Sequence, residues 1–135
     1  MDGVILTPLK QIHHPKGDVF HAMKASDVGF NGFGEAYFST IYKGEAKGWK
    51  KHTKMSLNLV VPIGVIECVI YNKRDQEFFS VVLSQKNYQR LTVKPGVWVA
   101  FRGLDKNNIL LNIASIEHNP KESVNLPLDD ISYKW

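Results

Sequence analysis

The chain has 135 residues, of which 44% are hydrophobic and 22% charged, and a formal net charge of +4; this predicts one globular domain over residues 1–135. No run reaches the roughly 20 apolar residues of a membrane span, the N-terminus lacks the pattern of a signal peptide, and the lone Cys68 is expected to be a buried thiol. We therefore expect a cytoplasmic protein without membrane contact. Its modest, scattered positive charge favours a phosphorylated ligand and is compatible with weak nucleic-acid contact.

Short segments rich in β-branched and aromatic residues recur along the chain, and no long stretch has helical periodicity. The expected strands cover residues 4–9, 19–23, 35–42, 56–62, 65–71, 78–83, 91–93, 97–102 and 109–116. Residues 84–89 are the one place where a helical turn fits, and the glycine-rich residues 29–34 are expected to form a loop. Many short antiparallel strands in a chain of this length predict a sandwich, jelly roll or small barrel, with its ligand between the sheets.

The segment 47–55 combines four lysines with Trp49 and His52 and stands directly before the apolar residues 57–61. A basic, aromatic segment that opens onto a strand can gather groups for an anionic ligand. In the following strand the apolar residues alternate onto one face, so Asn58 is expected to face outward or into a polar cavity.

Three later segments complete an ordered series with Lys47-Gly48-Trp49 and His52. They are Leu83-Ser84 with Asn87-Tyr88-Gln89, then Val93-Lys94-Pro95-Gly96-Val97-Trp98 with Phe101, then His118-Asn119-Pro120-Lys121-Glu122. In this order they resemble the dTDP-4-dehydrorhamnose 3,5-epimerase family and the related short sugar epimerase and ketoisomerase cupins, from about residue 3 to residue 135.

This resemblance implies an all-β, cupin-type double-stranded β-helix, or jelly roll, whose cavity binds a nucleotide-linked 4-keto-6-deoxy sugar. It further implies a homodimer that uses no metal and no cofactor. The corresponding role is epimerisation or isomerisation of a dTDP-sugar in the biosynthesis of surface polysaccharide such as lipopolysaccharide.

The family's chemistry is proton transfer at a carbon next to a ketone. A His base steadied by an Asp removes the proton, a Tyr acid returns one from the other face, and a Lys or Arg stabilises the enolate. Carried onto this chain, the base falls at Lys50, whereas His52 matches the second His of the shorter relatives and the ketoisomerases. The acid falls at Asn112, which cannot donate a proton as an acid, and the Asp falls near Leu126.

The resemblance thus nominates His52 as base or polariser, Lys50 as the group that stabilises the enolate or a phosphate, and His118 as the replacement acid. Acidic residues that could orient His52 are Glu35, Glu67 and Asp129. Substrate contacts are expected from Lys16, Lys47, Trp49, Asn58, Trp98 and Asn112.

Lys16, Trp49 and Trp98 could each bind a particular part of the nucleotide sugar. Lys16, followed by Gly17, stands where the family has an Arg-Gly pair that helps to hold the nucleotide. Trp49 and Trp98 could stack on a base or sugar ring, although a place in the core is the commoner role of such residues. A metal site is not expected, because the His-x-His and Glu cluster of metal cupins is absent after His52.

Two functions remain open at this stage. Besides the enzyme, the lost Tyr and Asp fit an inactive cupin that binds a nucleotide sugar or glycan or supports a pathway enzyme. If Lys50 and His52 face a cavity, catalysis is favoured, and if both face bulk solvent, binding alone is favoured. Nucleic-acid binding ranks last because no aromatic ladder accompanies the lysines.

Overall fold

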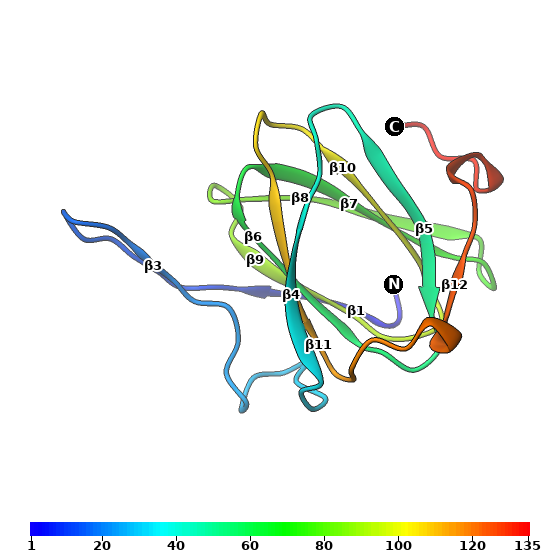
Figure 1. Cartoon of the computed structure of the whole chain (residues 1–135), viewed down its shortest axis with the longest axis horizontal. Helices are drawn as coiled ribbons and strands as arrows, with labels where there is room; N and C mark the ends of the chain where they lie inside the picture. Colours follow the sequence, from blue (N-terminus) through cyan, green and yellow to red (C-terminus); the bar gives the residue numbers. More distant parts are fainter.

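The computed structural model of the protein describes residues 1–135 and contains β-strands and two short 3-10 helices but no α-helix. Ten of the strands form two five-stranded antiparallel sheets that face each other (Figure 1). The all-β jelly roll expected from the sequence is therefore confirmed. No helix of the protein is long and apolar enough to cross a membrane.

The two sheets are defined by their strand orders. The first sheet runs in the order β1 (Val4–Pro8), β9 (Gln89–Val93), β6 (Leu57–Ile63), β11 (Ile109–Ala114) and β4 (Glu35–Thr40). The second sheet runs in the order β12 (Ser123–Asn125), β5 (Ala46–His52), β10 (Trp98–Gly103), β7 (Val65–Asn72) and β8 (Glu77–Ser84). The remaining elements are the paired strands β2 (Gln11–Ile12) and β3 (Val19–Phe20) and the 3-10 helices η1 (Pro120–Glu122) and η2 (Leu128–Asp130).

Each of the nine expected strands has a counterpart whose ends differ by at most a few residues, and residues 29–34 form the expected loop. Three strands were missed: β2, β5 and β12. The helical turn expected over residues 84–89 is wrong, because Ser84 and Asn87 exchange backbone hydrogen bonds in a tight turn. Lysines and a glycine give β5 low strand propensity, and pairing with a strand on either side outweighs that propensity.

The main core lies between the sheets. It is built from the inward apolar residues of the central strands, among them Leu57, Leu59, Ile66, Cys68 and Ile70. Cys68 is fully buried as expected, and burial raises the pKa of its thiol, so the sulfur stays protonated and unreactive.

The outer face of the first sheet is closed by the loop between β3 and β4 through polar contacts. Arg90 on β9 is 0% exposed. Its guanidinium donates to the carbonyl oxygens of Ala22 at 2.8 Å and Val28 at 3.1 Å and to a carboxylate oxygen of Asp27 at 3.2 Å. A single buried cation therefore holds this irregular segment against the sheet.

Asn58 on β6 also holds this loop against the sheet. Its side-chain amide donates to the carbonyl oxygen of Gly29 at 3.0 Å, and its side-chain oxygen accepts from the Thr92 hydroxyl at 2.6 Å. A Cβ on Gly29 would lie 2.6 Å from that hydroxyl oxygen, so the loop can approach this closely only with glycine there.

The outer face of the second sheet is covered by the C-terminal residues 126–135. A second hydrophobic cluster forms beneath them from Trp49, Val69, Trp98, Ala100 and Ile131. The two sheets are thus covered differently on their outer faces, one by hydrogen bonds to a loop and one by aromatic packing.

The β2–β3 hairpin extends away from the jelly roll (Figure 1). Its two strands pair only with each other, and the apolar side chains of Ile12 and Val19 are 41% and 55% exposed. Lys16 lies in the exposed turn of this hairpin.

Candidate active site

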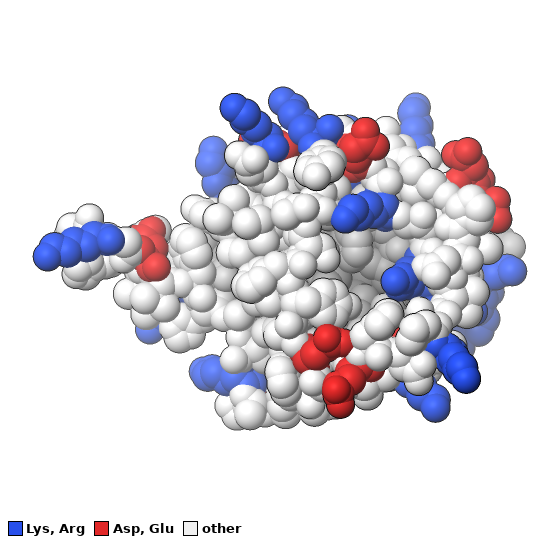
Figure 2. All heavy atoms as spheres, in the orientation of Figure 1, with Lys and Arg blue, Asp and Glu red and all other residues white.

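A cavity of about 280 Å³ lies between the two sheets. Strands β5 and β10 form one wall and β4, β6 and β11 the other. Figure 2 shows the hollowed face of the molecule, with Lys or Arg side chains on either side of the hollow. Its apolar lining is contributed by Ile41, Leu57, Leu59, Val99, Phe101 and Leu110.

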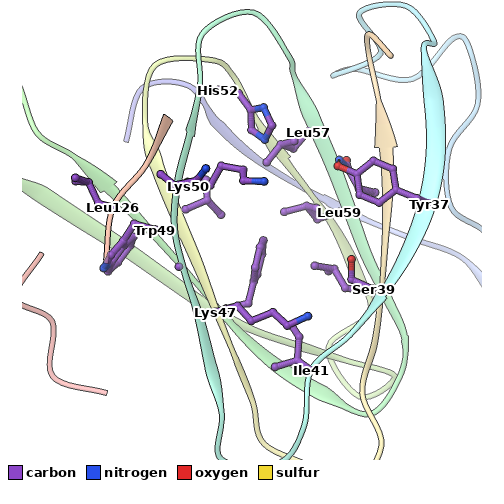
Figure 3. Close-up of a pocket in the computed structure, with 16 residues that line it drawn as sticks. Tyr37, Ser39, Ile41, Lys47, Trp49, Lys50, His52, Leu57, Leu59 and Leu126 are labelled. Carbon is purple, nitrogen blue, oxygen red and sulfur yellow. The ribbon is translucent and has the colours of Figure 1, made fainter. Parts of the chain in front are cut away.

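A β-bulge in β5 sets which of its side chains reach this cavity. Gly48 and Trp49 together stand opposite the single residue Ala100 of β10. A Cβ on Gly48 would lie 2.5 Å from the Ala100 Cβ, so the bulge needs glycine at that position. The extra residue lets Lys47 and Lys50 both point into the cavity while Trp49 points away from it (Figure 3).

His52, at the end of β5, lines the cavity and is only 8% exposed. Its Nδ1 is hydrogen-bonded to Oε1 of Glu122. Since a carboxylate can only accept, Nδ1 carries the ring proton, and Nε2 is left with a lone pair. Nε2 makes no hydrogen bond within the chain, so it can accept a proton from a ligand in the cavity.

Glu122 is itself firmly held. Its second carboxylate oxygen accepts from the backbone amides of Thr53, Lys54 and Met55 at 3.1, 3.0 and 3.2 Å. Burial alone would raise the pKa of Glu122, but the hydrogen bonds from His52, Lys54 and Met55 outweigh it and lower that pKa. Glu122 is therefore anionic at neutral pH and stabilises the imidazolium that forms when His52 takes up a proton.

The expectation that Glu35, Glu67 or Asp129 orients His52 is wrong. Glu35 accepts from the backbone amide of His118, Glu67 accepts from the Tyr133 hydroxyl at 3.1 Å, and Asp129 is exposed on η2. The correct partner, Glu122, is the last residue of the segment 118–122, which contributes to the family resemblance. Its 70-residue separation from His52 gave no local signal of contact.

The two cavity lysines differ in their contacts. Lys47 Nζ donates to the carbonyl oxygen of Thr40 at 2.7 Å. This hydrogen bond connects β5 to β4 across the mouth of the cavity. The ammonium of Lys50 has no hydrogen-bond partner in the chain and points into the cavity (Figure 3). It is therefore available to an anionic ligand group or to negative charge that develops on a ligand oxygen.

Tyr37 on β4 contributes a hydroxyl group from the opposite wall (Figure 3). Asn112 Nδ2 donates to this hydroxyl at 2.9 Å, while Asn112 Oδ1 accepts from the backbone amide of Asn58 at 3.1 Å. Because the Asn58 amide can only donate, it fixes the orientation of the Asn112 side chain. The Tyr37 oxygen therefore acts as an acceptor toward Asn112, and its own proton is free to point into the cavity.

Sequence reasoning missed Tyr37, although the alternation of residues 35–40 carried a usable signal. Side chains two apart share a face of a strand, so Tyr37 and Ser39 both face inward, as does Ile41 just beyond β4. The resemblance places the acid at Asn112. In the structure, Asn112 instead positions Tyr37 on the neighbouring strand β4, and Tyr37 can act as an acid.

The structure brings together four of the residues nominated from the sequence as cavity groups: His52, Lys50, Lys47 and Asn112. Trp49 borders the cavity through β5, but its ring is in the outer hydrophobic cluster and is 1% exposed.

Four other nominated residues lie elsewhere. His118 is exposed outside the cavity, and Lys16 is on the projecting hairpin. Asn58 faces outward from the first sheet, which is one of its two expected orientations. Trp98 is in the outer cluster at 6% exposure, with Lys51 Nζ 5.1 Å from its ring centroid, so it cannot stack on a ligand in the cavity.

The histidines of the chain do not cluster with other possible metal ligands. No three His, Cys, Asp or Glu side chains are grouped so that they could hold a metal ion. His13 instead pairs with Asp18 at 3.0 Å on the hairpin.

The matches to known proteins place this jelly roll among the cupins of the dTDP-sugar epimerase and isomerase class. Within it, the chain belongs to the family described as FdtA: WxcM-like, C-terminal, whose model matches residues 2–128. No curated protein matches the chain.

Solved structures agree with this placement. A dTDP sugar isomerase from Desulfovibrio desulfuricans G20 is 32% identical with a TM-score of 0.91, covering 95% of this chain and 86% of its own. The 3,4-ketoisomerase QdtA from Thermoanaerobacterium thermosaccharolyticum, solved with TDP-4-keto-6-deoxyglucose, is 20% identical with a TM-score of 0.80, covering 92% and 88%. The 3,5-epimerase RmlC from Legionella pneumophila Philadelphia 1, solved with dTDP-4-keto-L-rhamnose, is 16% identical with a TM-score of 0.82, covering 96% and 76%. These last two share the fold.

Proposed function

We propose that this protein is an isomerase or epimerase of a nucleotide-linked 4-keto-6-deoxy sugar and works by proton transfer next to the ketone. The observation that carries this proposal is the buried His52–Glu122 pair, whose free imidazole nitrogen shares a cavity with the Tyr37 hydroxyl. A base with its partner behind it and a proton donor on the opposite wall is what such chemistry requires.

In the proposed first step, His52 Nε2 takes the proton from a carbon beside the ketone. The electron pair of that C–H bond forms a C=C bond, and negative charge moves to the ketone oxygen. The Lys50 ammonium is the cavity cation placed to stabilise this enolate, and Glu122 stabilises the imidazolium.

In the second step, Tyr37 gives its proton to carbon. If the proton returns to the original carbon from the opposite face, the product is an epimer. If it goes to the former ketone carbon, the neighbouring hydroxyl group passes its proton to the enolate oxygen, and the product is the isomeric ketone. The apolar lining by Leu57, Leu59 and Leu110 suits the methyl carbon of a 6-deoxy sugar and keeps water from the enolate.

The nucleotide would bind toward the mouth of the cavity. Lys47 and Lys50 are exposed there, and their charge suits a diphosphate. Use of the product in surface polysaccharide and a cytoplasmic location stay predictions of the sequence.

A homodimer also belongs to this proposal. The β2–β3 hairpin leaves Ile12 and Val19 exposed and has no sheet partner in its own chain. A second copy would cover these side chains, and light scattering of the purified protein tests this directly.

The test of the activity is NMR of dTDP-4-keto-6-deoxyglucose with the protein in heavy water. We expect enzyme-dependent replacement of a proton next to the ketone by deuterium, lost in His52→Asn and kept in the matched control His118→Asn. Saturation transfer to the ligand without exchange would instead favour an inactive cupin that binds a nucleotide sugar. Absence of both signals would contradict the proposed substrate.

A further inference from the structure

The strand that carries the cavity cations and the base, β5, depends on the end of the chain for one of its two neighbours. On one side it pairs with β10, and on the other with β12, where Ser123 pairs with His52 and Asn125 with Lys50. Beyond β12, Trp49 and Leu126 exchange two backbone hydrogen bonds of 2.9 Å. Without this segment, β5 would be an open edge strand at the active site.

The same segment also belongs to the site. Glu122, the partner of His52, directly precedes β12. Asn125 and Leu126 contribute to the cavity lining. Any movement of the chain after Glu122 would therefore change both the hydrogen bond to the base and the shape of the cavity.

Pairing alone is a weak attachment for this segment. β12 has only three residues, and two of them are exposed, so its own side chains add little to the backbone pairing. The attachment comes from the outer face of the second sheet. Trp49, which directly precedes the cavity residue Lys50 on β5, donates from Nε1 to the carbonyl oxygen of Leu128 at 3.0 Å.

Aromatic rings extend this attachment to the last residue. The Trp135 ring centroid is 6.0 Å from that of Trp49 and 4.8 Å from that of Tyr133. Tyr133 in turn lies 5.2 Å from Phe78 and donates from its hydroxyl to Glu67 on β7 at 3.1 Å. Ring contacts of this kind favour defined tilted or edge-on geometries, so they hold the segment in one position.

We propose that residues 123–135, the C-terminal strap, are a positioning element for His52, fastened to the outer face of the second sheet by Trp49, Tyr133 and Trp135. The strap holds β5 and Glu122 in the geometry that the reaction needs. The catalytic part of this inference rests on the proposed function, whereas the effect on the His52–Glu122 hydrogen bond does not.

The experiment compares Trp135→Ala with Trp135→Phe, which keeps an aromatic ring, and with Tyr42→Ala, a matched control on a 77% exposed tyrosine outside the strap. For Trp135→Ala we expect kcat to fall on the order of 10- to 100-fold with little change in KM, because small misplacements of reacting groups have effects of this size. Trp135→Phe should recover most of the loss, and Tyr42→Ala should behave as wild type.

A second readout needs no substrate. The His52 Nδ1–H proton should give an NMR resonance, identified by its absence in His52→Asn, that exchanges slowly with water because Glu122 accepts it. In Trp135→Ala this resonance should broaden or exchange faster. If the wild type has no turnover, the proposed function fails, and this resonance still tests the strap.

The inference is overturned if folded Trp135→Ala keeps both wild-type kcat and the wild-type exchange rate of that proton. It is also overturned if the loss of kcat disappears when the assay is run well below the melting temperature, since the strap would then only add stability. If Trp135→Ala does not fold, the same two measurements are made on Tyr133→Phe. This variant removes only the hydrogen bond to Glu67.

Discussion

The two walls of the cavity differ in the charge of their polar groups and in what holds those groups in place. On β5, Lys50 is a cation, and the imidazole of His52 is held by a buried carboxylate. Across the cavity, Tyr37 and Asn112 are neutral, and a backbone amide fixes the pair.

This difference matches what each wall would do in a proton transfer. A base becomes charged during the reaction and needs a partner that stabilises the charge. A neutral acid with a fixed proton direction needs only orientation. Substitutions on the β5 wall should therefore alter charge and pH dependence, and substitutions on the opposite wall should alter the fate of the proton.

The largest expected effect is on the β5 wall. His52→Asn removes the base but keeps a polar side chain of similar reach, so turnover should fall on the order of 10²- to 10⁴-fold. Nucleotide affinity, measured by calorimetry with dTDP, should change little. Turnover comparable to wild type would show that the base is a different residue.

Tyr37→Phe tests the opposite wall. Product formation should fall on the order of 10²-fold because no proton can be returned from that side. Exchange of the substrate proton with heavy water should decline much less, since His52 still removes it. A parallel loss of both signals would contradict the role of Tyr37 as acid. Tyr42→Phe is the exposed control.

Glu122→Gln keeps the shape of the base's partner but removes its charge. We expect turnover to fall about tenfold, since the residue acts through His52, and the free energy of unfolding to fall by about 1.5–3 kcal/mol at neutral pH. Glu117→Gln, on an exposed neighbour, should change neither quantity.

The pH dependence of this loss has a definite sign. The pKa of Glu122 is lowered in the folded protein, so its contribution to stability is complete above the ordinary glutamate value of about 4.3 and is lost as the pH falls through the lower folded value. In urea unfolding, wild type and Glu122→Gln should therefore converge in stability as the pH is lowered below about 4. A stability difference that is constant with pH would contradict the ionised pair.

The smallest effect is expected on nucleotide binding at the mouth of the cavity. Lys50→Ala should weaken dTDP binding by about 1 kcal/mol, in the range of exposed ion pairs, and the loss should shrink at high salt. Lys86→Ala, on an exposed turn away from the cavity, is the control. An unchanged affinity together with reduced turnover would assign Lys50 to the enolate alone.

Much of the fold could be predicted because the central strands alternate apolar and polar residues with a period of two. Strand β6, with Leu57, Leu59 and Val61 on one side, is an example. Strand β5 was missed because lysines occupy its inner face where apolar residues are usual, and a bulge interrupts its alternation at Gly48.

The site could be predicted only in part for a related reason. The resemblance located His52 and Lys50 on one strand, but the groups that complete them come from distant segments. Glu122 reaches His52 across 70 positions, and Tyr37 meets Asn112 across 75. Such contacts depend on how the sheets face each other, which local sequence patterns do not encode.

The way in which Arg90 holds the loop between β3 and β4 bears on how this protein can evolve. Two of its three partners are backbone carbonyl oxygens, which every amino acid supplies. Apart from Asp27 and Gly29, the side chains of this loop are therefore free to diversify, and the loop can keep its path while its surface changes. Arg90 itself has no such freedom, because its loss would remove three of the contacts that hold this loop against the sheet.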